Sequence, residues 1–157
     1  MLKKYLFIFF LSMVPVIELR GAIPFAVNWE LDYWTALTVC AIGNMLPVPF
    51  IYFFARKILH WGADKKYIGK FFRFCIEKGE RGGQKLTARA GRGGLFVALM
   101  LFVGIPVPGT GAWTGTLAAS FLNMGIRSTV TAVSLGVVIA GIIMGVASTG
   151  VFSIFGI

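Results

Sequence analysis

The sequence carries little charge and few residues that could hold a metal or a disulfide framework. Only 13% of its 157 residues are charged and 57% are hydrophobic, whereas an ordinary soluble domain is about a quarter charged. One histidine and two cysteines are too few for a metal cluster or a disulfide scaffold, and no serine can be matched with a histidine and an acid. We therefore expect no metal, no cofactor and no enzymatic activity. The length predicts one domain over residues 1–157.

Positive charge is concentrated in one segment. Residues 56–92 contain 11 of the 15 lysines and arginines together with 3 of the 6 acids, and the rest of the chain is nearly neutral. Because basic residues next to membrane spans stay in the cytoplasm, we predict a cytoplasmic loop over 56–94. A nucleic-acid partner is disfavoured, because no soluble module presents the basic patch.

Two uncharged runs are long enough to cross a bilayer, which takes about 20 apolar residues. They predict membrane spans over 35–55 and 128–157. Lys3 and Lys4 indicate a cytoplasmic N-terminus, and the acidic segment 28–34, with its two tryptophans, indicates an outer loop. We therefore expect a multi-pass protein of the inner (plasma) membrane, with its N-terminus and its basic loop both in the cytoplasm.

The basic loop itself contains a second pattern. Residues 64–78 repeat apolar residues at helical spacing, with basic residues on the opposite stripe. This predicts an amphipathic helix, which lies either in the headgroup layer of the membrane or against the protein itself. The glycine-rich stretch 79–94 lacks the ending of a phosphate-binding loop, and we expect a flexible linker there.

Two further apolar runs are interrupted by proline. In 95–126, Pro106 and Pro108 remove backbone donors and end the helix, and the arm before them reaches about half-way through a bilayer. These lengths predict a re-entrant hairpin. The run 5–27 is also broken, by two prolines that flank two charges, and it either crosses the membrane or re-enters.

The two broken segments are expected to face each other across a cavity. Irregular backbone at membrane depth is tolerated only where protein or a watery cavity satisfies its polar groups. The predicted fold is therefore an all-α integral membrane protein with two opposed re-entrant hairpins and transmembrane helices. The predicted hairpin-tip residues are Gly21, Pro24, Pro106, Pro108 and Gly109.

Glu18 and Arg20 are the two charges inside the first broken run. A charge at the centre of a membrane helix costs about 2.5–3.5 kcal/mol, so each charge requires a partner or a function. Two positions apart on a helix, the side chains do not meet. Either they bind each other across an unwound turn, or Glu18 is protonated for part of a cycle. We predict proton coupling by Glu18 and anion contact by Arg20, whose planar guanidinium suits phosphate and carboxylate; a structural ion pair and an interfacial position are the alternatives.

Four uncharged side chains are candidates for contact with a substrate, namely Asn44, Thr110, Trp113 and Thr114. Asn44 is a polar residue inside the predicted span 35–55, and the other three follow the proline–glycine break. Each has a structural alternative. The asparagine could donate to the carbonyl groups that proline frees, and the threonines could cap the second arm of the hairpin.

Three stretches together resemble the small multidrug export family: Glu18-Leu-Arg-Gly-Ala-Ile-Pro24, Gly43-Asn44 and Gly104-Ile-Pro-Val-Pro-Gly-Thr-Gly-Ala-Trp-Thr-Gly115. More distantly, the chain resembles the DedA superfamily. That resemblance implies two re-entrant hairpins that face each other and, in several relatives, movement of polyprenyl phosphate or phospholipid. Two parts of the DedA pattern have no match here, a Pro-x-x-Pro-Gly-Glu stretch in the first hairpin and an arginine within the second.

The sequence thus predicts a membrane transporter, with proton-coupled export of a small molecule or ion through a cavity between the hairpins. A lipid-phosphate flippase and a non-transporting membrane scaffold are the alternatives. The expected partners are membrane lipids and the small-molecule or lipid-phosphate cargo. Glycine pairs at helical spacing, which let helices approach closely, suggest a homo-oligomer in the form of a parallel dimer.

Overall fold

The computed structural model describes residues 1–15, 17–107 and 109–155, with positions 75, 79, 83, 86, 87 and 151–155 described by their backbone alone. These residues form helices and no strand, which confirms the all-α prediction. In chain order the helices are α1 (Leu2–Met13), α2 (Glu18–Asn28), α3 (Tyr33–Met45), α4 (Val48–Ala63), α5 (Gly69–Gly104), α6 (Ala112–Phe121) and α7 (Ile126–Phe155).

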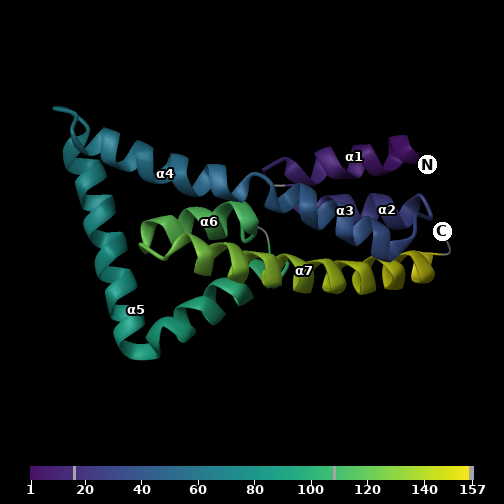
Figure 1. Cartoon of the computed structure of the whole chain (residues 1–157). Coiled ribbons are helices and arrows are strands. Elements are labelled where there is room, and N and C mark those ends of the chain that lie inside the picture. The colour runs from purple at the N-terminus through teal and green to yellow at the C-terminus, as the bar shows by residue number, and fades with distance from the viewer. Residues whose placement is uncertain (16, 108, 156–157) are drawn as a thin grey trace.

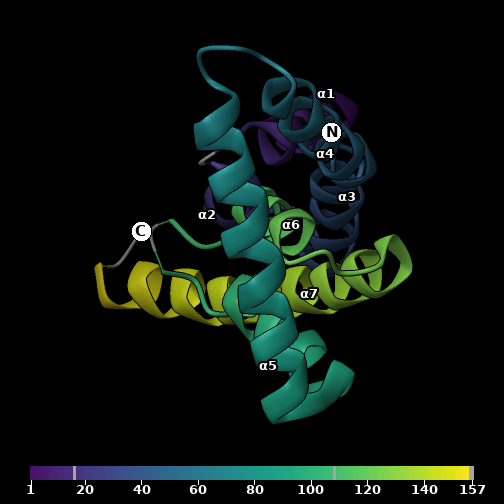
Figure 2. The same ribbon diagram turned by 90° about the vertical axis from the view of Figure 1, so that its left-hand side faces the viewer.

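The helices form an elongated bundle in which α7 runs along most of the length (Figure 1). α3 and α4 follow each other along the opposite side, and α1 and α2 fold back on each other at the end that carries both termini. At the other end α6 lies between α4 and α7. The first part of α5 stands across the bundle at that end, and Figure 2 shows it upright in front of α7.

α1 and α2 form the first hairpin, and a proline sets the position of its turn. Pro15 disfavours helix at the residue before it, and Val14 is accordingly extended, so α1 ends at Met13. α2 begins at Glu18, whose φ of 51° marks the reversal of the chain. The run 5–27 therefore breaks at Pro15.

Pro24 and Gly21, which were predicted at the tip of this hairpin, lie inside α2 instead. A proline in a helix interior removes one hydrogen bond and bends the helix, but it does not reverse the chain. The prediction of a tip at these two residues is therefore wrong, and the chain reverses before them, between the end of α1 and the start of α2.

α3 has a side-chain cap. Asp32 accepts hydrogen bonds from the Thr35 hydroxyl (2.6 Å) and the Thr35 N–H (2.8 Å). Both hydrogen bonds lower the pKa of Asp32 from its ordinary value, and the bond from the Thr35 hydroxyl has the larger effect. The cap therefore contributes its full stability at pH values above the ordinary pKa of an aspartate. This contribution is lost as the pH falls through the lowered pKa that Asp32 has in the folded protein.

Two stretches of the described chain are long and apolar enough to cross a membrane, Tyr33–Ala63 and Ile126–Gly150. The first contains both α3 and α4, which are separated by residues 46–47. The predicted span 35–55 is therefore not one continuous helix. The second stretch lies within α7 and overlaps the predicted span 128–157.

α5 differs most from the sequence prediction. Residues 79–94, expected as a flexible linker, are helical except at Gly91, whose φ of 70° and ψ of 177° bend the helix. Alanine, leucine, glutamine and charged residues in this stretch favour helix and offset the cost of each glycine, about 1 kcal/mol. The prediction of a linker is therefore wrong, and the amphipathic helix expected over 64–78 begins at Gly69 as part of α5.

α5 and α6 form the second hairpin. α5 ends at Gly104, irregular backbone follows, and α6 begins at Ala112. The predicted interruption of the helix at Pro106 is confirmed. Pro108, the other proline predicted at this tip, lies outside the described residues.

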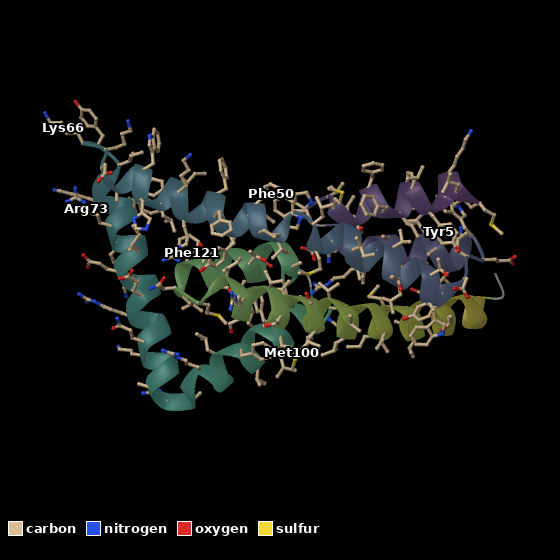
Figure 3. The ribbon with its side chains drawn as sticks, viewed as in Figure 1. Tyr5, Phe50, Lys66, Arg73, Met100 and Phe121 are labelled. Atoms are coloured by element: carbon tan, nitrogen blue, oxygen red, sulfur yellow. The ribbon has the colours of Figure 1, made fainter. Side chains whose placement is uncertain are left out.

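The N-terminus and the basic segment lie at opposite ends of the molecule (Figure 1). Lys4 donates to the carbonyl of Trp29 (3.5 Å), so the N-terminus and the segment 28–34 share one end. At the other end Lys66 and Arg73 point away from the bundle (Figure 3). The N-terminus and the basic loop, which are predicted on the same side of the membrane, thus lie at opposite ends of the molecule, because α2 returns the chain to the end where α1 began. Their sides of the membrane stay a prediction.

The core lies where the two hairpins meet α3 and α7. Its most deeply buried side chains include Ile8, Leu19, Ile23, Val103, Val133 and Val137. The glycines that suggested a dimer pack against helices of the same chain. A side chain at Gly141 would overlap Leu37, and one at Gly145 would overlap Tyr33. They bring helices of the same chain together and give no support to a dimer, which stays a prediction.

Gly91→Ala should destabilise the protein. The φ and ψ of Gly91 belong to a region that is essentially glycine-only, at a cost of about 1–3 kcal/mol for another residue. No described atom lies within 4 Å of the added Cβ, so the effect is purely conformational. Gly93→Ala is the matched control, because Gly93 is also in open space but helical, and alanine is favoured there by about 1 kcal/mol. Equilibrium unfolding in detergent gives the free energy of unfolding of both variants. Equal values would contradict the glycine-only conformation of Gly91 at the bend.

Candidate functional site

The carboxylate of Glu18 binds the start of α6. It accepts hydrogen bonds from the N–H groups of Trp113 (3.0 Å) and Ala112 (3.3 Å), the first two residues of that helix. Glu18 is only 4% exposed, so its charge needs these donors in place of water. It acts as an N-terminal cap for α6 that is supplied from the other hairpin.

Arg20 binds the opposite side of the same interruption. Its guanidinium donates to the carbonyl oxygens of Val107 (2.7 Å), Val103 (2.9 Å) and Ile105 (3.2 Å). The last carbonyl groups of a helix have no donor within the helix. Arg20 therefore satisfies the end of α5, as Glu18 satisfies the beginning of α6.

The signs of the two charges match the helix ends that they contact. A helix start carries about half a positive charge and a helix end about half a negative one, so the carboxylate and the guanidinium each meet the opposite sign. The two side chains do not bind each other, and the described residues contain one ion pair, Arg81–Glu77, elsewhere. The alternative in which Glu18 and Arg20 bind each other is therefore wrong, because each side chain binds backbone groups of the second hairpin.

A cavity of about 500 Å³ lies between the tips of the two hairpins. The first hairpin contributes Pro15, Glu18 and Arg20, the second contributes residues from Pro106 to Leu117, and α7 contributes Met144. Its walls are mainly apolar. The volume falls within the range of about 300–1,000 Å³ that is typical of small-molecule sites.

Seven of the residues predicted for the site line this cavity, namely Glu18, Arg20, Pro106, Gly109, Thr110, Trp113 and Thr114. The threonine hydroxyls are engaged by backbone. Thr110 donates to the carbonyls of Val107 (2.8 Å) and Ile105 (2.9 Å), and Thr114 donates to that of Gly111 (3.4 Å). Both residues therefore stabilise the break as well as line the cavity. Gly21, Pro24 and Asn44 do not line it.

Two buried polar groups at the site have no hydrogen-bond partner among the described residues. One is the indole Nε1 of Trp113, an atom that is itself buried although other parts of the residue line the cavity. The other is Oδ1 of Asn44, a residue that is 2% exposed and borders, together with Glu18 and Arg20, a narrow gap without room for a water molecule. A buried group without a partner costs about 1–3 kcal/mol. Both atoms therefore mark positions where a ligand or a second state of the site would gain a hydrogen bond.

Sequence reasoning missed several contributors to the site. Val107, Leu117 and Met144 line the cavity, but nothing in the pattern separates them from other apolar residues. Gly111 did carry a signal, because a glycine in a break often permits close approach of another group. A side chain at Gly111 would overlap the carboxylate of Glu18.

A family model with the description "Putative small multi-drug export protein" matches residues 18–143. The matched stretch begins at Glu18 and includes both charged residues, the second hairpin and most of α7. It confirms the family resemblance inferred from the three motif stretches, whereas the link to the DedA superfamily stays a prediction. No curated protein and no solved structure matches the chain.

Arg20→Ala should lower the free energy of unfolding by about 1.5–3 kcal/mol, because three carbonyl oxygens lose a charged donor. Arg20→Lys should recover part of the loss, since an ammonium group donates but lacks the planar fork. Arg89→Ala, at an exposed position of α5, is the control, with an expected change within about 0.5 kcal/mol. Unfolding in detergent micelles compares the three variants. A loss for Arg20→Ala no larger than that for Arg89→Ala would show that the helix end does not need the guanidinium.

Proposed function

We propose, from the premise that this chain belongs to the small multi-drug export protein family, that it is a membrane transporter which exports a small amphipathic molecule through the cavity between its two hairpins. The observation that carries the proposal is the cavity of about 500 Å³ with Glu18 and Arg20 in its wall. Charged residues within an apolar bundle typically mark the path of a substrate or a proton, and the volume suits a drug-sized molecule.

In this proposal the two hairpins enter the membrane from opposite sides and meet near its middle. α1, α2 and α6 contain 12, 11 and 10 residues. Each is therefore about 15–18 Å long, about half of the hydrocarbon thickness. α7 and the α3–α4 stretch are long enough to cross fully. Interrupted backbone is acceptable at mid-depth because each hairpin supplies the partners that the other lacks.

The orientation follows from the charge of the two ends. The end with the first part of α5 holds most of the lysines and arginines and faces the cytoplasm. The end with Lys4, Trp29 and both termini faces outward from the inner membrane. Export therefore runs from the basic end toward the end that carries the termini.

Glu18 couples this transport to protons. When ionised, its carboxylate holds the first two N–H groups of α6. When protonated, it loses the charge that favours a helix start and gains an O–H that needs an acceptor. The Oδ1 of Asn44, which has no partner among the described residues and belongs to a residue that borders the same narrow gap as Glu18, is the acceptor that we assign to that O–H. Uptake of a proton thus releases α6 and opens the cavity, and loss of the proton closes it.

The cavity favours a lipophilic cation that carries a hydrogen-bond acceptor. Val107, Leu117 and Met144 offer apolar contact, and the ring of Trp113 suits a cation as well. In this proposal the N–H of Trp113, which is buried and has no acceptor among the described residues, becomes the donor for the acceptor group of the cargo when the cavity opens. The Glu18 carboxylate supplies the negative charge, while the positive charge of Arg20 is matched by three carbonyl groups.

Arg20 also favours a second candidate, a lipid-phosphate flippase. A guanidinium has five N–H donors, so the bonds to three carbonyl groups leave donors for an anionic headgroup. The mainly apolar walls of the cavity would accept an acyl or polyprenyl chain. A non-transporting scaffold is the third candidate, and a flux measurement separates all three.

The decisive measurement uses the purified protein in proteoliposomes. A lipophilic cationic dye should move when a pH gradient is imposed, and it should move faster than a labelled polyprenyl phosphate. Glu18→Gln should abolish the gradient-driven part of the dye flux, because an amide does not exchange the proton. Glu30→Gln removes an exposed carboxylate outside the cavity and should keep the flux.

Other outcomes would select another candidate. Faster movement of polyprenyl phosphate than of dye, lost in Arg20→Ala, would favour the flippase. A gradient-driven flux that is unchanged in Glu18→Gln would rule out proton coupling by this residue. Absence of flux for both cargos in correctly folded protein would favour the scaffold.

Trp113→Phe should raise the half-saturating concentration of a cargo that carries an acceptor. The variant keeps an aromatic ring and removes one N–H donor, so the expected increase is about tenfold. A cargo of the same shape without the acceptor should be unaffected. Trp34→Phe, at an exposed position of α3, is the control. An equal increase for both cargos would indicate lost packing in place of a lost hydrogen bond.

A further inference from the structure

A second cavity, of about 490 Å³, lies at the end of the molecule that carries the first part of α5. It is formed by Arg92 and Leu95, which follow the bend at Gly91, by the connection between α6 and α7, and by the first turn of α7. The two cavities have no described residue in common. The cargo site proposed between the hairpins therefore does not explain it.

Arginine side chains gather at this second cavity. Arg92 and Arg127 line it, and Arg56 donates to the side chain of Asn123, which lines it too. Glu80 borders a smaller adjoining space beside Arg56, but in the described part of the chain the one ion pair lies elsewhere on α5. Positive charges that border the same cavity without an ion-pair partner attract an anion.

Backbone groups strengthen the attraction. The Thr129 N–H donates to the carbonyl of Gly125 (2.9 Å) at the start of α7. The N–H groups that precede Thr129 in this helix have no acceptor within it, and the start of a helix favours negative charge. Because Gly125 and Ser128 both line the cavity, these N–H groups lie at the same place as the arginines.

Part of the cavity wall is apolar. Leu95 and Met124 are 7% and 6% exposed, and Leu122 joins them. A small inorganic anion would use only the arginine side of this cavity. A molecule with a phosphoryl group and a hydrocarbon chain would use both sides, because apolar surface gains free energy when it is removed from water.

We propose that this cavity binds the phosphoryl headgroup of an anionic lipid, with the hydrocarbon chain beside the leucines. The basic end of the protein is the end that faces the cytoplasmic surface of the membrane in the proposed orientation. Basic pockets between helices at that surface bind anionic headgroups in membrane proteins. A soluble phosphate ion offers the arginines the same chemistry, so the experiment includes it as a separate arm.

The test uses the full chain in detergent micelles, titrated with phosphatidylglycerol or phosphatidylcholine, and counts bound lipid by native mass spectrometry. Phosphatidylglycerol should bind about tenfold more tightly, because choline offsets the phosphate charge of the other lipid. Arg92→Gln and Arg127→Gln should each weaken the binding of phosphatidylglycerol about tenfold, as expected for the loss of one charged hydrogen bond. Arg89→Gln is the control, since it removes the same charge from an exposed position of α5 outside the cavity.

Equal binding of the two lipids, or equal weakening in all three variants, would overturn the proposal, because either result indicates general attraction between charges. Displacement of phosphatidylglycerol by inorganic phosphate, with loss of that competition in Arg92→Gln and Arg127→Gln, would assign the site to soluble phosphate and overturn the lipid assignment. Circular dichroism of each variant checks folding. The measurement requires no transport, so its outcome is independent of the flux of Glu18→Gln.

Discussion

The hydrogen bonds from Glu18 and Arg20 to the ends of α6 and α5 hold the two hairpins together. A helix that stops inside an apolar bundle leaves carbonyl groups without donors, and the helix that resumes leaves N–H groups without acceptors. In lipid each such group costs several kcal/mol. The guanidinium of Arg20 donates to the carbonyl groups at the end of α5, and the carboxylate of Glu18 accepts from the N–H groups at the start of α6. If the two side chains were exchanged, each helix end would face a charge of its own sign. The meeting of the tips and the cavity between them follow from this arrangement.

Because of the same contacts, Glu18 can have both a structural role and the role in transport that we propose. Glu18 is buried against α6 and also borders the cavity, so a change in its protonation changes what holds the second hairpin. Switches in proteins commonly work by such a local change of charge at a contact that has two arrangements. In the proposed function Asn44 Oδ1, which has no partner among the described residues, would accept the hydrogen bond of a protonated Glu18 and so define the second arrangement.

The sequence was informative where a single strong local effect decides the structure. Proline ends α1 before Pro15 and interrupts the chain at Pro106, and the cost of buried charge singled out Glu18 and Arg20. It was less informative where many weak effects compete, as in the glycine-rich part of α5. The partners of the two charges were not predictable, because they are backbone groups 83 to 95 residues away and every residue has the same backbone. The position of the N-terminus at the end opposite the basic segment was not predicted either, since charge bias indicates sidedness only when each segment crosses the membrane.

Three consecutive residues at the start of α2 face three different surroundings. The carboxylate of Glu18 reaches α6, the side chain of Leu19 is 1% exposed in the core, and the guanidinium of Arg20 reaches α5. Neighbouring side chains on a helix are rotated by about 100°, so one added or deleted residue within this triplet would turn at least one of them away from its surroundings. The spacing of these three residues therefore matters as much as their chemical type. A gap in an alignment at this point would mark a chain that cannot build the same junction, even where both charged residues are retained.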